Sequence, residues 1–293
     1  MKLVHCLIVC LLFVGCDKSS KKRFIDTDIE KLKVNDVSLS EPGMGDWLDM
    51  HAESGQSFEQ YKKVHPVSPN EKQNKIYLQP IGKFSFRELD IVTNTAEYIE
   101  IFFNLKVVML PSIDEATISG KARRIHWQGH EQFLTTSILD SLQTKIPSDA
   151  IVVMAITAHD LYPDPNWNFV FGQARTKKRV GISSLFRFLP DESDSSANSS
   201  LGLERFIKTS SHEISHMFTC QHCTNAVCVM NGSNSVMEAD ERPNRLCTNC
   251  LSKLQWNLGF AVKPRQKNLL DFFSKHKLNK DHDYASKDLA LLN

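Results

Sequence analysis

The residues with the clearest chemistry lie on one short segment, Ser211–His216, which contains the pattern H-E-x-x-H. The segment ends a run whose apolar residues have the three- and four-residue spacing of an amphipathic helix. Residues four positions apart lie on the same helix face, so His212 and His216 can reach one metal ion. Glu213 lies one step round the helix, where its carboxylate can take a proton from a metal-activated water. The pattern therefore indicates a zinc site with a general base beside it.

A catalytic zinc site requires a third protein ligand and an open coordination position. His222, six residues beyond His216, supplies that ligand if the helix ends sharply and the chain turns back. The alternative is a helix that carries two solvent-facing histidines without a metal. A third histidine at this spacing extends the shorter motif and favours the metal site.

Five of the eight cysteines lie between positions 220 and 250, and the other three lie within the first sixteen residues. Cys247-x-x-Cys250 can direct two thiolates at one ion, and Cys223 and Cys228 can complete a closed four-cysteine zinc site. Two disulfides are the alternative in an oxidising compartment. Because Cys223 follows His222 directly, the structural ion would help to hold the third histidine.

The first sixteen residues have the pattern of an export signal. Lys2 precedes an apolar run, Leu3–Val14, that is too short to span a bilayer as a helix. The run ends in Phe-Val-Gly-Cys16, which resembles the lipobox of bacterial lipoproteins. We expect residues 1–15 to be a signal peptide and Cys16 to carry a lipid, giving an exported protein anchored to a membrane of the bacterial cell envelope or periplasm. An ordinary cleaved signal peptide and a short anchor helix are the alternatives.

The rest of the chain predicts one large domain with an α/β (α+β) fold. Residues 16–45 are polar and are expected to form a tether with little fixed structure, residues 46–265 a catalytic domain, and residues 266–293 a polar tail. Strands alternate with helices along this domain, which favours a mixed sheet packed on helices. The predicted strands are 75–81, 106–110, 150–156, 168–173 and 180–188, and the predicted helices are 88–104, 130–146 and 203–218.

Composition gives no indication of a nucleic-acid partner. Lys plus Arg number 35 and Asp plus Glu number 34, without a basic cluster. A zinc-ribbon module that binds nucleic acid through its C-x-x-C pair is therefore disfavoured.

The arrangement of histidines and cysteines resembles that of the archaemetzincins. Their signature is H-E-x-x-H-x-x-G-x-x-H-C, four residues, C-x-M, sixteen or seventeen residues, and C-x-x-C. This chain has His212 to Cys223, then four residues, Cys228-Val229-Met230, sixteen residues, and Cys247 to Cys250. Flanking segments are also similar, including Asp160–Pro163, Trp167–Ala174, Gly181–Ile182 and Glu238–Pro243.

The resemblance implies a zinc peptidase with two zinc ions, acting as a monomer on peptide or protein substrates. It assigns the catalytic zinc to His212, His216 and His222, the general base to Glu213, and the structural zinc to the four patterned cysteines. Met230 would form a hydrophobic floor beneath the histidines. The implied fold is a metzincin-like catalytic domain with a twisted mixed sheet, an active-site helix and a C-terminal zinc-bearing subdomain. Residues 180–186 would be the sheet edge that binds an extended peptide.

One position departs from the signature, because Thr219 replaces the glycine after the second histidine. Glycine adopts positive φ without steric cost, whereas a β-branched residue there costs about 1–3 kcal/mol. If Thr219 has positive φ, we expect Thr219→Gly to stabilise the protein by about 1 kcal/mol. The departure keeps open an alternative, an inactive zinc-binding lipoprotein that retains the scaffold. Cys220 lies outside the pattern and has no assigned role.

Overall fold

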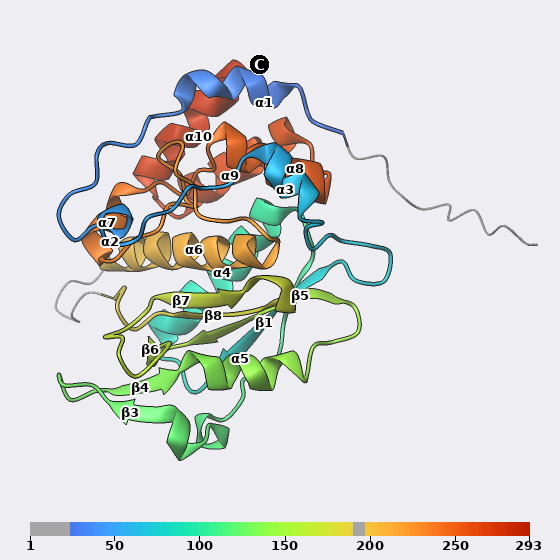
Figure 1. Cartoon of the computed structure of the whole chain (residues 1–293). Helices are drawn as coiled ribbons and strands as arrows, with labels where there is room; N and C mark the ends of the chain where they lie inside the picture. Colours follow the sequence, from blue (N-terminus) through green and yellow to red (C-terminus); the bar gives the residue numbers. More distant parts are fainter. Residues whose placement is uncertain (1–23, 190–196) are drawn as a thin grey trace, which may run out of the picture.

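The structure is a computed structural model that describes residues 24–189 and 197–293. The predicted signal peptide and the lipid-attachment residue Cys16 lie outside the described residues. The centre of the fold is a five-stranded sheet in the order β2-β1-β5-β8-β7, in which only β7 is antiparallel to its neighbour (Figure 1). Its strands are β1 (Lys75–Ile81), β2 (Val107–Met109), β5 (Ala150–Thr157), β7 (Gly172–Arg175) and β8 (Val180–Ser184). The predicted mixed sheet is confirmed.

The two central strands are apolar along almost their whole length. β5 is buried at every residue, and β1 is buried from Ile76 onward. Continuous apolar runs of this kind are typical of parallel strands that have both faces covered. Helices α4 (Phe86–Phe103) and α6 (Ala197–Met217) contact each other on one side of the sheet, and α5 (Thr135–Gln143) packs on the other side.

A second, three-stranded sheet corrects one sequence prediction. The helix predicted for residues 130–146 begins only at Thr135, because Glu131–Leu134 forms strand β4. This strand pairs with β3 (Arg123–Ile125) and with β6 (Asp160–Tyr162), and Phe133 is fully buried. Pairing with two neighbouring strands outweighs the helical spacing of this segment. Two short 3-10 helices, η2 (Glu115–Thr117) and η3 (Gly120–Ala122), precede this sheet, and η4 (Thr176–Lys178) connects β7 to β8.

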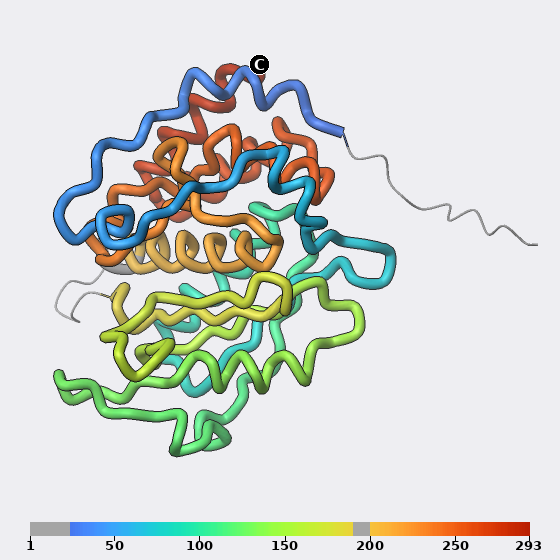
Figure 2. The backbone as a smooth tube through the Cα atoms, viewed as in Figure 1, coloured from blue at the N-terminus to red at the C-terminus, as the bar shows by residue number. Residues whose placement is uncertain are grey.

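The predicted tether is wrong for residues 24–45, which have defined structure against the C-terminal helices. We call residues 26–67 the N-terminal strap; it contains α1 (Asp28–Lys31), η1 (Leu32–Asn35), α2 (Trp47–Met50) and α3 (Phe58–Lys63). Ile29 and Leu32 are buried, and Asp36 forms an ion pair of 2.7 Å with Arg245. Because most of its residues are polar, the sequence pattern does not reveal the few residues that anchor this segment. Figure 2 shows the strap in blue along the outside of the helical half.

The predicted polar tail is also wrong. Helix α9 (Val262–Lys275) crosses the expected boundary at residue 265, and α10 (Asn279–Leu291) packs against it. Their buried faces combine apolar side chains such as Phe272 with charged ones such as Asp288, which pairs with Arg245 at 2.8 Å. Buried charges with partners lower the apparent hydrophobicity of these helices. With α7 (Val236–Glu241) and α8 (Thr248–Leu258), they form the helical half of the protein.

Among the residues that the structure describes, no helix is long and apolar enough to cross a membrane.

Candidate metal centres and the cleft between the two halves

Three imidazoles converge at the end of helix α6, as the sequence predicts. His212 and His216 lie one turn apart on the helix, and His222 comes from the loop that follows it. The ring centroids are 4.6–5.2 Å apart, and one nitrogen of each ring lies within 4.8 Å of the others. The Nε2 atoms of His212 and His216 are 3.0 Å apart. This arrangement suits three ligands of one metal ion.

Each of these histidines has a partner for its other ring nitrogen. Nδ1 of His212 lies 2.8 Å from the carbonyl oxygen of Val229, and Nδ1 of His216 lies 2.6 Å from that of Cys220. Nδ1 of His222 lies 2.9 Å from the carboxylate of Glu53. Protonated Nδ1 atoms that donate to these oxygens leave the Nε2 lone pairs free for metal. Glu53 lies in the N-terminal strap, 169 positions from His222, and no local pattern in the sequence identifies it.

The protonation of this site fits a divalent cation. Burial lowers the pKa of His216 to about 3 and also lowers the pKa of His212, so both are neutral at pH 7 and able to bind metal. Burial raises the pKa of Glu213 to about 8. A nearby cation would favour the carboxylate and lower this pKa. The donor set of three imidazoles also suits zinc.

Helix α6 ends at Met217, and two residues later Thr219 has a φ of +76°, in the left-handed region. The amide of Thr219 donates to the carbonyl oxygen of His216 at 2.8 Å, and that of Cys220 donates to Ser215 at 3.1 Å. Of the two alternatives for Thr219, the structure has the one with positive φ, the conformation that glycine adopts without steric cost. The Thr219 hydroxyl also accepts a hydrogen bond from the amide of Val67 at 3.2 Å, a contact that the sequence does not reveal.

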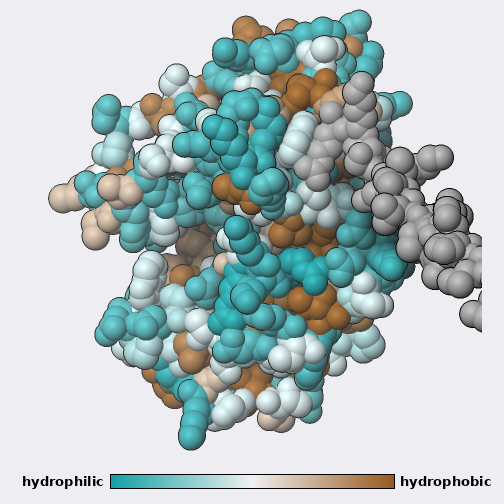
Figure 3. All heavy atoms as spheres, turned by 45° about the vertical axis from the view of Figure 1, so that its right-hand side comes forward, coloured by the Kyte–Doolittle hydropathy of each residue, from teal (hydrophilic) through white to brown (hydrophobic). Residues whose placement is uncertain are grey.

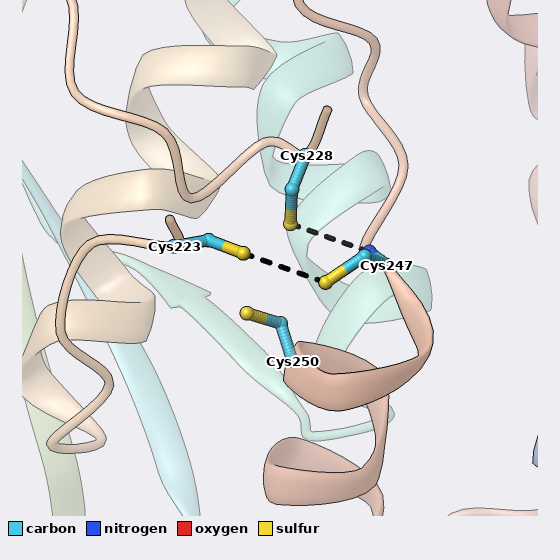
Figure 4. A group of neighbouring side chains, drawn as sticks. All are labelled: Cys223, Cys228, Cys247 and Cys250. Atoms are coloured by element: carbon cyan, nitrogen blue, oxygen red, sulfur yellow. Dashed lines mark hydrogen bonds between the residues drawn. The ribbon is translucent and has the colours of Figure 1, made fainter. Parts of the chain in front are cut away.

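The four patterned cysteines meet beside this loop, with their sulfur atoms within 4.8 Å of one another (Figure 4). All four side chains are buried, and the cysteines are free thiols rather than the alternative disulfides. The sulfur atoms of Cys223 and Cys247 are 3.5 Å apart. The cluster is made of Cys223 and Cys228 on the loop after α6, and Cys247 and Cys250 at the start of α8.

The pKa values of the thiols indicate that the cluster requires a cation to hold all four cysteines as thiolates. Hydrogen bonds from the other three thiols, chiefly Cys228, hold the pKa of Cys223 well below its usual range. Burial raises the pKa of Cys228, and hydrogen bonds to the neighbouring thiols raise that of Cys250. One thiolate can thus be stabilised by its neighbours, whereas four ionised thiolates require a cation among them. A tetrahedral zinc ion meets that requirement.

The loop between Cys223 and Asn231 connects the two clusters. The carbonyl oxygen of Val229 lies within hydrogen-bonding distance of Nδ1 of His212. The carbonyl oxygen of Met230 accepts a hydrogen bond from the amide of Cys223 at 2.7 Å. Met230 is fully buried in the main core. The Asn231 side chain joins the loop ends, accepting from the amide of Cys228 and donating to the carbonyl of Cys223, both at 2.7 Å. Sequence reasoning missed Asn231, although an Asn in a tight loop is a common local acceptor.

A cleft of about 490 Å³ lies at the histidines, lined by residues of both halves of the molecule. Figure 3 shows a hollow between the upper, helical half and the lower, sheet half, near the left margin. Glu213 lines the cleft beside Gly172, where an added Cβ would lie 2.8 Å from its Cγ. From the strap, Trp47 lines the cleft, and the His51 ring stacks on that of Trp167 with centroids 6.2 Å apart.

The predicted substrate edge is wrong by one strand. β8 pairs with β5 on one side and with β7 on the other, so residues 180–184 are interior. The edge strand is β7, and its residues Gly172, Gln173 and Ala174 line the cleft. The burial of the two strands differs accordingly, because β8 is buried throughout and β7 is only half-buried.

Comparison with known proteins places this geometry in a family. Residues 105–256 match the model of peptidase family M54. Archaemetzincin-2 of Homo sapiens is 34% identical over 269 residues, which cover 80% of this chain and 73% of that protein. Archaemetzincin-1 of Rattus norvegicus is 31% identical, covering 76% of this chain and 51% of that protein. The crystal structure of archaemetzincin from Methanopyrus kandleri has a TM-score of 0.51 at 29% identity, covering 66% of this chain and 99% of that one.

The mixed α/β fold and the metallopeptidase signature thus define a zinc-dependent metallopeptidase, a hydrolase whose substrates are peptides or proteins. The chain belongs to peptidase family M54, the archaemetzincins. The whole N-terminal strap and helices α9 and α10 lie outside the segment that matches the family model.

Proposed function

We propose that this chain hydrolyses peptide bonds with a catalytic zinc held by His212, His216 and His222, and with Glu213 as the general base. The observation that carries the proposal is the convergence of three oriented imidazoles on one point of the cleft that Glu213 also lines. Zinc bound there would polarise the scissile carbonyl and make the attacking water more acidic.

Glu213 is placed to move the proton. It is buried at the cleft wall, and the absence of a side chain on Gly172 leaves room for its carboxylate. As general base, Glu213 takes a proton from the attacking water and passes it to the leaving amine. The free edge of β7 is placed to pair its main chain with an extended substrate, which aligns the scissile bond along the cleft.

The second zinc is proposed to be structural and to be held by Cys223, Cys228, Cys247 and Cys250. Four buried thiols form a closed site with no position for substrate. Its support of catalysis would be mechanical, because the same loop carries Cys223 next to His222 and presents the Val229 carbonyl to His212.

The N-terminal sequence supports a further proposal on location. We propose that residues 1–15 are a signal peptide, that Cys16 is lipidated, and that the enzyme is exported and anchored to a membrane of a bacterial cell envelope. The support is the apolar run and the Val-Gly-Cys16 pattern. The protein should partition into detergent, and Cys16→Ser should make it partition into water. A parent protein that stays in the aqueous phase would contradict the lipid anchor.

Glu213→Gln is the direct test of the catalytic proposal. The amide keeps the size of the side chain but cannot take a proton, so hydrolysis of a peptide library should fall by about 10²–10⁴-fold. Zinc content, measured by elemental analysis, should stay at the parent value because Glu213 is not a ligand. Parent protein that holds zinc but cleaves no peptide would support the inactive zinc-binding alternative.

A further inference from the structure

One end of the cleft is lined by two cationic side chains, Lys208 and Arg242. Lys208 precedes His212 by four residues on α6, so it lies one turn, about 6 Å, along the same helix face. Its ammonium donates to the carbonyl of Ala239 at 2.9 Å and lies 3.9 Å from the carboxylate of Glu204. Its side chain is only 7% exposed. Positive charge therefore lies one side chain's length from the proposed catalytic centre.

The side chain of Arg242, directly after α7, forms no hydrogen bond with any residue in the described ranges 24–189 and 197–293. Its Nε is buried without an acceptor, and its side chain is 14% exposed. Among the described residues its ion-pair partner is Glu238, whose carboxylate lies 3.6 Å from Nη2, longer than a hydrogen bond. Glu238 already accepts from the amides of Trp47 at 3.0 Å and Asn234 at 2.7 Å. A guanidinium that lacks acceptors at a largely buried position favours a bidentate anion.

Several arginines in the described structure donate hydrogen bonds to carboxylates, whereas Arg242 has only the longer ion pair with Glu238. Arg245 binds Asp288 and Asp36, and Arg187 and Arg205 each bind one aspartate through two nitrogens. Arg87 on α4 also has unpartnered nitrogens, but it does not line the cleft. Arg242 is thus the arginine that offers free donors to a molecule in the cleft.

The acidic residues of the cleft wall do not satisfy these donors. Asp164, in the loop after β6, accepts from the amide of Asn166 at 2.9 Å and forms no ion pair with Arg242. Glu213 has its own proposed role and forms no ion pair with either cation in the described structure. The indole nitrogen of Trp47, another cleft residue, is also buried without an acceptor. The cleft therefore combines donors and positive charge at the end formed by α7.

We propose that Arg242, assisted by the charge of Lys208, is a specificity-determining residue that binds a carboxylate of the peptide substrate near the scissile bond. This inference rests on the proposed peptidase function and names its substrate class. The carboxylate has two possible sources, an Asp or Glu side chain and the free C-terminus of a short peptide. Either presents two oxygens to the planar guanidinium.

Three peptides with one sequence distinguish these sources. The first has Glu near the cleaved bond and an amidated C-terminus, the second has Gln there and an amidated C-terminus, and the third has Gln there and a free C-terminus close to the bond. The zinc-loaded parent should cleave the first or the third about 10- to 100-fold faster in kcat/KM than the second, the scale of a charged hydrogen-bonding contact. Which of them is preferred identifies the source.

Arg242→Gln should abolish this preference, so that the ratio of kcat/KM between the preferred peptide and the second peptide falls to about one. Arg87→Gln is the matched control, since it removes an unpartnered guanidinium outside the cleft and should leave the preference intact. Melting temperature and zinc content of both variants show whether they fold. Equal cleavage of all three peptides by the parent would overturn the inference. So would a preference that survives Arg242→Gln.

A binding measurement separates failure of this inference from failure of the proposed function. Calorimetry should show that zinc-loaded Glu213→Gln protein binds the first or the third peptide about 10-fold or more tightly than the second. Adding Arg242→Gln to this variant should remove the difference in affinity. If the parent cleaves nothing but this Arg242-dependent binding is present, peptidase activity is wrong and the carboxylate site stands. If the parent cleaves all three peptides at the same rate, the peptidase function stands and the carboxylate site is wrong.

Discussion

The histidine cluster and the cysteine cluster meet on one loop, yet the chain builds them in different ways. The three histidines are partly exposed in a cleft, and their Nδ1 atoms are held by two backbone carbonyls and the Glu53 carboxylate. The four cysteines are buried, and they contact one another and nearby amides. Ligand number and access thus distinguish a site that can bind substrate from a site that holds the fold together.

The comparison predicts that the cysteine site affects stability most. Cys247→Ser should cost on the order of 5 kcal/mol or more in the free energy of unfolding, because metal binding at a closed site is coupled to folding. Cys220→Ser is the matched control: it is a buried thiol outside the cluster, whose burial raises its pKa to about 12. That change should cost only about 1–2 kcal/mol. Thermal melting and zinc analysis test both variants, and equal losses would contradict a structural metal at the cysteines.

Chelation should separate the two sites by access. We expect two zinc ions per chain; a moderate chelator should remove the one at the histidines and abolish hydrolysis. The cysteine-bound ion should stay, and the far-ultraviolet circular dichroism should change little. Elemental analysis before and after dialysis gives the count. Release of both ions at the same chelator concentration would show that the clusters do not differ in the way proposed, and so would a total of one ion.

Glu53 provides a smaller test, confined to the histidine site. Glu53→Gln removes the negative charge beside His222 Nδ1 and should weaken zinc binding there by about 10- to 100-fold, the usual effect of a residue that orients a metal ligand. Glu59→Gln, in the same strap but paired only with Lys62, should leave the affinity unchanged. Competition with a zinc-binding dye measures the affinity of both. An unchanged value for Glu53→Gln would mean that the backbone alone orients His222.

Thr219 should give the smallest effect. Its positive φ favours glycine by about 1–3 kcal/mol, but its hydroxyl accepts the Val67 amide, and losing that bond costs about 1 kcal/mol. Thr219→Gly should therefore lie within about 1 kcal/mol of the parent rather than clearly above it. Thr219→Ala retains the strain and loses the acceptor, so it should be less stable than Thr219→Gly. Melting of the zinc-loaded proteins decides the order, and an alanine variant more stable than the glycine variant would contradict this account.

The spacing of ligands in the sequence predicted the convergence of both clusters because it reflects local geometry. His212 and His216 share a helix face, and Cys247 and Cys250 share a turn. Glu53 could not be predicted in the same way, because its contact with His222 joins distant parts of the chain. The strands β1 and β5 were predicted almost to the residue, since apolar runs mark buried strands.

Errors in the fold prediction fell where tertiary pairing outweighs local pattern. Residues 131–134 form a strand because β3 and β6 lie on either side of them. The strap and the last two helices look polar, because buried charges such as Asp288 take part in their packing. Pairing of charges between distant segments is invisible in a linear pattern, and the predicted domain was therefore too short at both ends.

The strap has a consequence for the order in which the molecule is made. Asn35 donates to Asp288 across 253 positions, and Asp36 binds Arg245 across 209. The strap is synthesised early, but the surface on which it docks is complete only when helix α10 has been synthesised. Until then the strap lacks the part of its docking surface that α10 supplies, so its docking, and with it the contact of Glu53 with His222, is incomplete. We therefore expect the chain to complete its catalytic metal site only after its last helix is available for folding.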